Sequence, residues 1–246
     1  MAAGATWFAV DAAAQQRAPV SGTSERPVEL DEFEQRVRDF LLEHPQVIMD
    51  ALQVLQERQR AAEADDIKRT IAARRDEIFN DPNAPVGGHP AGDATVVEFF
   101  DYNCPYCRRV APTLTEVEEA DANLRVLYKE FPILGAGSRF AARAALAAHK
   151  QGKYLPFHTA LMQAQEQLDE LNVMKIAQAV GLDAERLRQD MQDAAIGEAI
   201  ARNLQLAEAL GITGTPSFVI GDQIVPGAVG RSRLERLIAE ARDRGT

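Results

Sequence analysis

The stretch that decides the fold of this chain is Val97-Glu98-Phe99-Phe100-Asp101-Tyr102-Asn103-Cys104-Pro105-Tyr106-Cys107. It begins as an apolar run, passes through a polar break, and ends in the only two cysteines among 246 residues. Two thiols three positions apart can react with each other or with another molecule, and with nothing else in the chain. We therefore expect the pair to exchange disulfides with other molecules.

Two structural roles for the cysteine pair are disfavoured. A disulfide that closes so short a loop stabilises a fold by only about 2 kcal/mol in the chain-entropy model. With 46% hydrophobic residues, the chain can build a core without it. A closed zinc site needs four ligands, commonly including a second pair of cysteines or histidines at short spacing. The histidines are scattered over positions 44, 89, 149 and 158, so we expect no bound metal and no cofactor.

The residues after Cys104 predict a helix over 104–120 with that cysteine at its tip. Pro105 suits the first turn of a helix, where its missing N–H costs nothing, and Leu114 belongs to an apolar side. Unpaired N–H groups and the positive end of the helix dipole favour a thiolate at the tip. Cys107, one turn further in, would be shielded and would act as the resolving thiol. Exchange through a mixed disulfide needs this asymmetry.

An acidic residue lies inside the apolar strand that precedes the pair. Glu98 has apolar neighbours and stands six residues before Cys104. A carboxylate is costly to bury, so a buried Glu98 would have a raised pKa. Placed beneath the thiols, it could take the proton that Cys107 must lose. On an edge strand it would instead face solvent.

A second segment of interest is Thr213-Gly214-Thr215-Pro216-Ser217-Phe218-Val219-Ile220. A proline at the start of an apolar strand indicates a turn or a cis peptide bond. A cis bond at Pro216 would leave the main chain of Thr215 open to an extended peptide near the disulfide. A trans proline that begins an edge strand is the alternative.

Together, these two segments resemble the DsbA-like branch of the thioredoxin superfamily. The segment Lys129-Glu130-Phe131-Pro132-Ile133-Leu134 and the Ala-rich helix after it also look like this branch. The resemblance covers about 94–246 and is closest to the bacterial ScsC-type proteins. Members of that group carry an N-terminal helical segment, and some oligomerise through it. The implied fold class is α/β, a thioredoxin fold with a helical insertion at about 138–210, preceded by an N-terminal helical segment.

The resemblance also implies a role for individual residues. The catalytic set would be the nucleophile Cys104, the resolving Cys107 that forms the redox disulfide with it, the buried acid Glu98 and the cis-proline Pro216. The substrate would contact Thr215, Pro105 and Tyr106. Threonine before the cis-proline is similar to the isomerases of the wider family, whereas strongly oxidising members often carry valine there. The Pro-Tyr between the cysteines also differs from the Pro-His of the archetypal oxidase.

We therefore expect a disulfide isomerase or reductase. A dithiol oxidase, and a copper-binding protein or chaperone that uses the same thiols, remain the alternatives. The implied partners are unfolded or misoxidised proteins and a membrane redox partner that resets the cysteine pair.

Composition limits the partners and the compartment. A net charge of −10 and a pI near 5.0 argue against nucleic acid as a partner. A chain without other thiols suits an oxidising compartment, and we expect a secreted protein of the bacterial periplasm. Residues 1–27 are interpreted as a flexible tail or a signal-peptide remnant.

Residues 28–80 are predicted to be helical. Asp31 with Glu34 three positions later is typical of a capping box, and Pro45 interrupts the helix. Two apolar stripes in this segment cannot both be buried by one helix, so it either packs on the catalytic domain or joins other copies. The resemblance favours a homo-oligomer.

The remaining chain divides into a linker and the catalytic domain. Residues 81–93 are rich in proline and glycine and are interpreted as a linker or hairpin lead-in, with Pro85-Val86 as the candidate for a short first strand. The domain over 94–246 is expected to contain the following elements: strands at 94–100, 124–130 and 223–225, and helices at 104–120 and 231–243.

Overall fold

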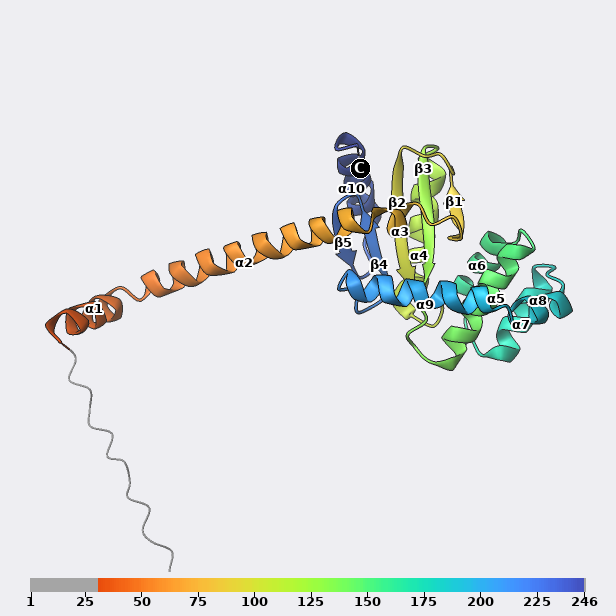
Figure 1. The fold of residues 1–246 in the computed structure, drawn as a ribbon, viewed down its shortest axis with the longest axis horizontal. Coiled ribbons are helices and arrows are strands. Elements are labelled where there is room, and N and C mark those ends of the chain that lie inside the picture. Colours follow the sequence, from red (N-terminus) through yellow and green to blue (C-terminus); the bar gives the residue numbers. More distant parts are fainter. Residues whose placement is uncertain (1–30, 246) are drawn as a thin grey trace, which may run out of the picture. The chain divides into compact units, whose positions relative to one another are not determined.

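The structure is a computed structural model that describes residues 31–245 (Figure 1). The proposed tail or signal-peptide remnant, 1–27, lies outside the described residues. Residue contacts divide the chain into two compact units, with the boundary between Leu55 and Gln56. The predicted helical segment 28–80 therefore extends across this division.

The first unit contains helix α1, Glu32–Glu43, and the beginning of helix α2, Gln46–Ala73. The predicted capping box is confirmed. The backbone N of Glu34 donates to Asp31 Oδ1 at 2.8 Å, and the backbone N of Asp31 donates to Glu34 Oε2 at 3.2 Å. The helix breaks around Pro45, as the sequence predicts.

The second unit is built on a five-stranded sheet with the order β1-β3-β2-β4-β5 (Figure 1). The strands are β1 Val86–Gly88, β2 Ala94–Phe100, β3 Leu124–Glu130, β4 Ser217–Ile220 and β5 Gln223–Pro226. Strands β2 and β3 run parallel, and the other neighbours are antiparallel. The central position of β2 places its carboxyl end, where the cysteine loop begins, at the middle of the sheet.

Helices cover both faces of this sheet. The helices that follow α2 are α3 Arg75–Phe79, α4 Pro105–Ala120, α5 Ala136–Lys150, α6 Tyr154–Gln163, α7 Glu170–Ala179, α8 Ala184–Asp190, α9 Ala194–Ala209 and α10 Arg231–Asp243. The apolar sides of α4 and α10 pack on one face, and those of α3 and α9 on the other. Helices α5 to α9 form the insertion between β3 and β4. None of the helices within residues 31–245 has the length and apolarity that crossing a bilayer requires.

Side chains of β2 alternate between the two cores. Val96 and Phe100 belong to the core beneath α4 and α10, whereas Val97 and Phe99 belong to the core beneath α3 and α9. Because successive side chains of a strand point to opposite faces, Glu98 lies on the α4 side. The predicted thioredoxin fold with a helical insertion and an N-terminal helical segment is confirmed.

Candidate functional site

The first cysteine is fixed at the tip of helix α4. Cys104 is the N-cap residue of this helix, and Pro105 lies in its first turn. The backbone N of Cys104 donates to the carbonyl of Asp101 at 3.0 Å, and the Cys104 carbonyl accepts from the backbone N of Arg108 at 3.1 Å. The predicted helix start is confirmed, and the sulfur is placed where the unpaired N–H groups of the first turn favour an anion.

The loop that carries Cys104 is held by a buried carboxylate. Asp101 is 1% exposed. Its Oδ1 accepts from the backbone N of Asn103 at 2.8 Å, and its Oδ2 accepts from the backbone N of Leu134 at 2.9 Å. These two bonds tie the turn before the cysteine to the segment after β3.

An arginine clamps the same loop from the helix side. Nε of Arg108 donates to the carbonyl of Tyr102 at 2.7 Å. Its Nη1 donates to the carbonyls of Ala164 and Glu166, at 2.9 and 3.1 Å. The active-site loop is therefore joined to the residues that follow α6 in the helical insertion.

The threonine–proline segment meets the nucleophile directly. The Thr215–Pro216 peptide bond is cis, and the Cys104 thiol donates to the Thr215 carbonyl at 3.2 Å. The backbone N of Gly227 donates to the carbonyl of Pro216 at 2.8 Å, which holds the loop against the end of β5. The fold thus brings together two segments more than a hundred residues apart in the chain.

Cys107 differs from Cys104 in its surroundings. Both thiols are free and buried in this structure, but Cys104 keeps 4% exposure at the tip of α4, whereas Cys107, inside the first turn, has none. Burial raises the pKa of the Cys107 thiol, and the charge of Glu98 raises it further. Cys107 therefore holds its proton until a base beside it can accept one.

Glu98 lies on the central strand and not at an edge of the sheet. It faces Tyr128 of β3 and Phe218 of β4 in the strand register and is 1% exposed. Its Oε1 has no hydrogen-bond partner among the described residues. Burial raises the pKa of Glu98 to about 8. A carboxyl with this pKa can both accept and release a proton near neutral pH.

Two cavities flank the cysteine helix. One, of about 710 Å³, lies between α4 and α6 and has Glu98 in its wall. The other, of about 760 Å³, is bordered by Thr215, Pro216 and Tyr106 and has an apolar wall that includes Ile212. Thr215, which borders the second cavity, is the residue whose carbonyl lies 3.2 Å from the Cys104 sulfur.

Sequence reasoning did not identify a polar cluster beneath the loop. It consists of four buried side chains, those of Tyr102, Glu130, Tyr154 and His158. The available signal was Glu130 itself, a second acidic residue at the end of an apolar strand. Within residues 31–245, no group of three or more His, Cys, Asp or Glu side chains is arranged to hold a metal ion.

Comparison with protein families gives two matches. A model described as the DSBA-like thioredoxin domain matches residues 95–239. A model described as the copper resistance protein ScsC N-terminal domain matches residues 30–62. The two matches cover different parts of the chain, and the first contains both cysteines and the Thr215–Pro216 bond.

Solved structures and curated proteins include similar chains. A thioredoxin-like oxidoreductase from Silicibacter pomeroyi DSS-3 is 54% identical, with a TM-score of 0.68, and the match covers 69% of this chain and 98% of that one. A periplasmic thioredoxin-like protein from Salmonella enterica serovar Typhimurium is 33% identical, with a TM-score of 0.63, covering 69% and 95%. The Na(+)/H(+) antiporter NhaA 1 of Mycobacterium sp. strain KMS is 30% identical over 179 residues, 71% of this chain and 28% of the antiporter. The chain spans about a quarter of the length of the curated relatives it matches.

Proposed function

Because this chain belongs to the DsbA-like thioredoxin family, a family of thiol–disulfide oxidoreductases, we propose that it exchanges disulfides with protein substrates through Cys104 and Cys107. One observation carries the proposal. The Cys104 sulfur lies at the tip of α4 against the Thr215 carbonyl, while Cys107 is fully buried behind it. One thiol is thus placed to meet a substrate and the other to finish the exchange.

The first step is attack on a substrate disulfide. The Cys104 thiolate forms a bond to one substrate sulfur, and the substrate's own S–S bond breaks, so that the second substrate sulfur leaves as a thiolate. The N–H groups at the start of α4 stabilise the attacking anion before the step. The product is a mixed disulfide between Cys104 and the substrate.

The second step is resolution by Cys107. Its thiol loses a proton to Glu98, and the resulting thiolate attacks the Cys104 sulfur. The Cys104–Cys107 disulfide forms, the mixed disulfide breaks, and the substrate leaves as a thiolate. Glu98 suits the role of base because it lies on the α4 side of the sheet and burial raises its pKa to about 8.

The expected substrate is an unfolded or misoxidised protein. An extended polypeptide would lie along Thr215 and Pro216 and place an apolar side chain in the cavity of about 760 Å³ beside them. Pro105 and Tyr106 would contact the substrate from the helix side. Of the two directions, we favour isomerase or reductase over oxidase because a threonine precedes the cis-proline. A membrane redox partner in the periplasm would reset the cysteine pair.

Insulin reduction and the refolding of scrambled ribonuclease test the activity. The wild-type chain should accelerate both reactions, and Cys104→Ser should abolish the acceleration because the attacking sulfur is gone. Cys107→Ser should retain the first attack and accumulate mixed disulfide. Equal activity of wild type and Cys104→Ser would contradict the proposal.

We also propose that the first unit joins copies of the chain. Its large apolar side chains are between 38% and 69% exposed: Phe33, Val37, Phe40, Leu42, Val47, Ile48, Met49, Leu52, Val54 and Leu55. Helix α1 has 12 residues and no buried side chain, and an isolated helix of that length is marginal in water. A second copy of the chain would cover this surface and stabilise the helix.

Sedimentation of the full chain tests the oligomer. The wild type should sediment as an assembly. The double variant Leu42→Glu with Met49→Glu should sediment as a single chain because it places charge on the apolar surface. The control is Leu171→Glu, which changes a residue of α7 that is 62% exposed and should leave the assembly intact. A wild-type chain that is already monomeric would overturn this proposal.

A further inference from the structure

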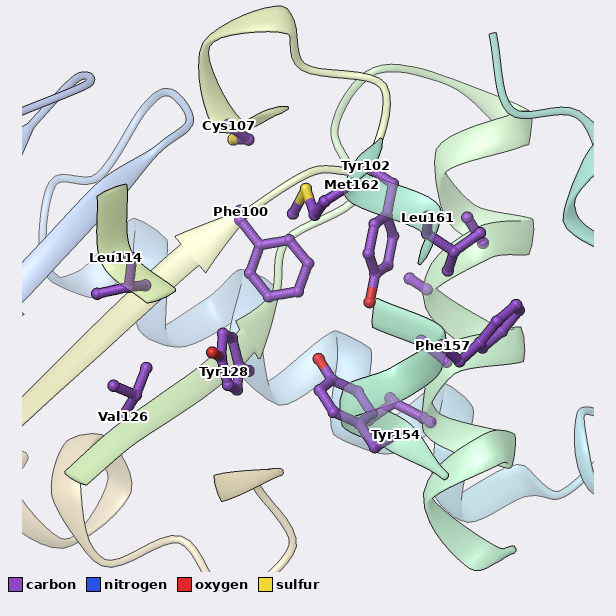
Figure 2. Close-up of a cluster of buried hydrophobic side chains, with 14 of the residues drawn as sticks. Phe100, Tyr102, Cys107, Leu114, Val126, Tyr128, Tyr154, Phe157, Leu161 and Met162 are labelled. Atoms are coloured by element: carbon purple, nitrogen blue, oxygen red, sulfur yellow. The ribbon is translucent and has the colours of Figure 1, made fainter. Parts of the chain in front are cut away.

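A buried carboxyl that the proposed exchange does not use lies beneath the active-site loop. Glu130 is the last residue of β3 and is 1% exposed. Its Oε1 accepts hydrogen bonds from Tyr102 Oη at 3.0 Å and from Tyr154 Oη at 2.8 Å. Figure 2 shows the two phenol oxygens pointing into the same space from the loop and from α6. Two elements far apart in the sequence therefore share one acceptor.

The imidazole of His158 completes this cluster. Its Nδ1 lies 3.1 Å from Tyr102 Oη, and its ring stacks on Tyr154 at an interplanar angle of 20°. Burial lowers the pKa of His158 to about 3, so the ring is neutral at physiological pH. Because the Tyr102 proton is donated to Glu130, the imidazole donates to Tyr102 through Nδ1. The phenol oxygen thus has a donor and an acceptor.

Burial favours the neutral form of the carboxyl at the centre. Burial raises the pKa of Glu130 well above its usual value, and the bonds from Tyr154 and Tyr102 oppose the rise without cancelling it. A glutamine side chain has the same shape and keeps the accepting oxygen. Glu130→Gln is therefore a conservative replacement, whereas Glu130→Leu removes the acceptor.

Tyr102 links this cluster to the nucleophile. It lies two residues before Cys104, and its carbonyl accepts from Nε of Arg108 at 2.7 Å. Its main chain is thus fixed by α4 and its side chain by Glu130 and His158. Tyr102 is 1% exposed, so its phenol oxygen has no water to replace these partners.

We propose that Glu130 is a positioning residue for Cys104. The hydrogen bond from Tyr102 to Glu130 holds Tyr102 in place and thereby fixes the loop that sets the Cys104 sulfur at the tip of α4. This inference rests on the proposed function. The reduced form depends on that placement because its Cys104 thiol donates a hydrogen bond to the Thr215 carbonyl at 3.2 Å. The disulfide form has no proton on this sulfur and cannot make that bond. Loosening the loop therefore destabilises the reduced form more than the oxidised form.

The test is the equilibrium between the full-length protein and glutathione. Tyr102→Phe and Glu130→Leu should shift this equilibrium about fivefold toward the protein disulfide, the size of one net hydrogen bond lost from the reduced form. Glu130→Gln should stay within about twofold of wild type. The matched control is Tyr128→Phe, which removes a phenol oxygen that bonds to Glu118 and not to Glu130, and it should also stay within about twofold.

The outcomes separate positioning from a purely structural role. A structural role lowers the thermal midpoint in both oxidation states without moving the glutathione equilibrium, and that result overturns the inference. The inference is also overturned if Glu130→Gln shifts the glutathione equilibrium as far as Glu130→Leu does. If Glu130→Leu does not fold, Tyr102→Phe carries the test, since it removes a single oxygen. A wild-type protein that does not exchange with glutathione overturns the proposed function itself, whereas an unchanged Tyr102→Phe equilibrium overturns only this inference.

Discussion

Replacing Glu98 by glutamine should make the protein more stable at neutral pH. Burial raises the pKa of Glu98 from 4.5 to about 8, so between these values the folded chain holds a proton that the unfolded chain has lost. Wild-type stability therefore falls as the pH rises through this window. Glutamine cannot ionise, so the free energy of unfolding of Glu98→Gln does not fall with pH in this way.

The size of the effect follows from the shift in pKa. Each pH unit within the window is worth about 1.4 kcal/mol. We take the free energy of unfolding of Glu98→Gln minus that of wild type as the measured difference. This difference should be about 3 kcal/mol larger at pH 7 than below pH 4.5. Above pH 8 the difference should level off at about 5 kcal/mol.

Denaturant unfolding from pH 4 to 9, in both oxidation states of the cysteine pair, measures this difference. The control is Glu116→Gln, which neutralises an exposed carboxylate elsewhere on α4 that lies 3.7 Å from Arg231. Its difference from wild type should stay within about 0.5 kcal/mol at every pH. A constant difference between Glu98→Gln and wild type would show that Glu98 titrates as an exposed carboxyl and would refute the reasoning.

Two further substitutions test the packing. Asp81→Ala should lower the free energy of unfolding by about 3 kcal/mol, because it leaves the ammonium of Lys129, 1% exposed and 2.6 Å from Asp81, without its counter-charge. The control is Asp66→Ala, which removes one partner of a surface ion pair and should lower the free energy of unfolding by less than about 0.5 kcal/mol. Equal losses in the two variants would contradict this prediction. Gly137→Ala should cost about 2 kcal/mol although alanine favours helices, because its Cβ would lie 2.2 Å from the Leu168 carbonyl oxygen. A gain in stability from Gly137→Ala in denaturant unfolding would show that this close approach is not real.

Local patterns were sufficient for the elements around the cysteines. The apolar strand followed by proline predicts β2 and α4, and the structure has them at Ala94–Phe100 and Pro105–Ala120. The tight turn between β4 and β5 also follows from local chemistry, since Gly221 there has a φ of 59°. The family matches confirm the predicted resemblance to the DsbA-like and ScsC-type proteins. The strand, the helix and the turn depend on residues close together in the chain.

Contacts between distant segments could not be predicted in the same way. Glu130 lies 28 residues from Tyr102 and 24 from Tyr154. The spacing of apolar residues in α6 indicates that one side of this helix is buried, but it does not indicate which residues that side contacts. The ion pair between Lys129 and Asp81 joins residues 48 apart. The division within α2 falls inside a continuous helix, where no local sequence pattern marks a boundary.

Trapping of mixed disulfides tests the central claim most directly. Reduced Cys107→Ser, mixed with a peptide that contains one disulfide, should accumulate a covalent adduct at Cys104, because the Cys107 thiol that resolves it in the wild type is gone. Cys104→Ser should form no adduct at the same concentrations, since the Cys107 thiol is buried and burial raises its pKa. An adduct at Cys107 that forms as fast as the one at Cys104 would contradict the assignment of attacking and resolving thiols.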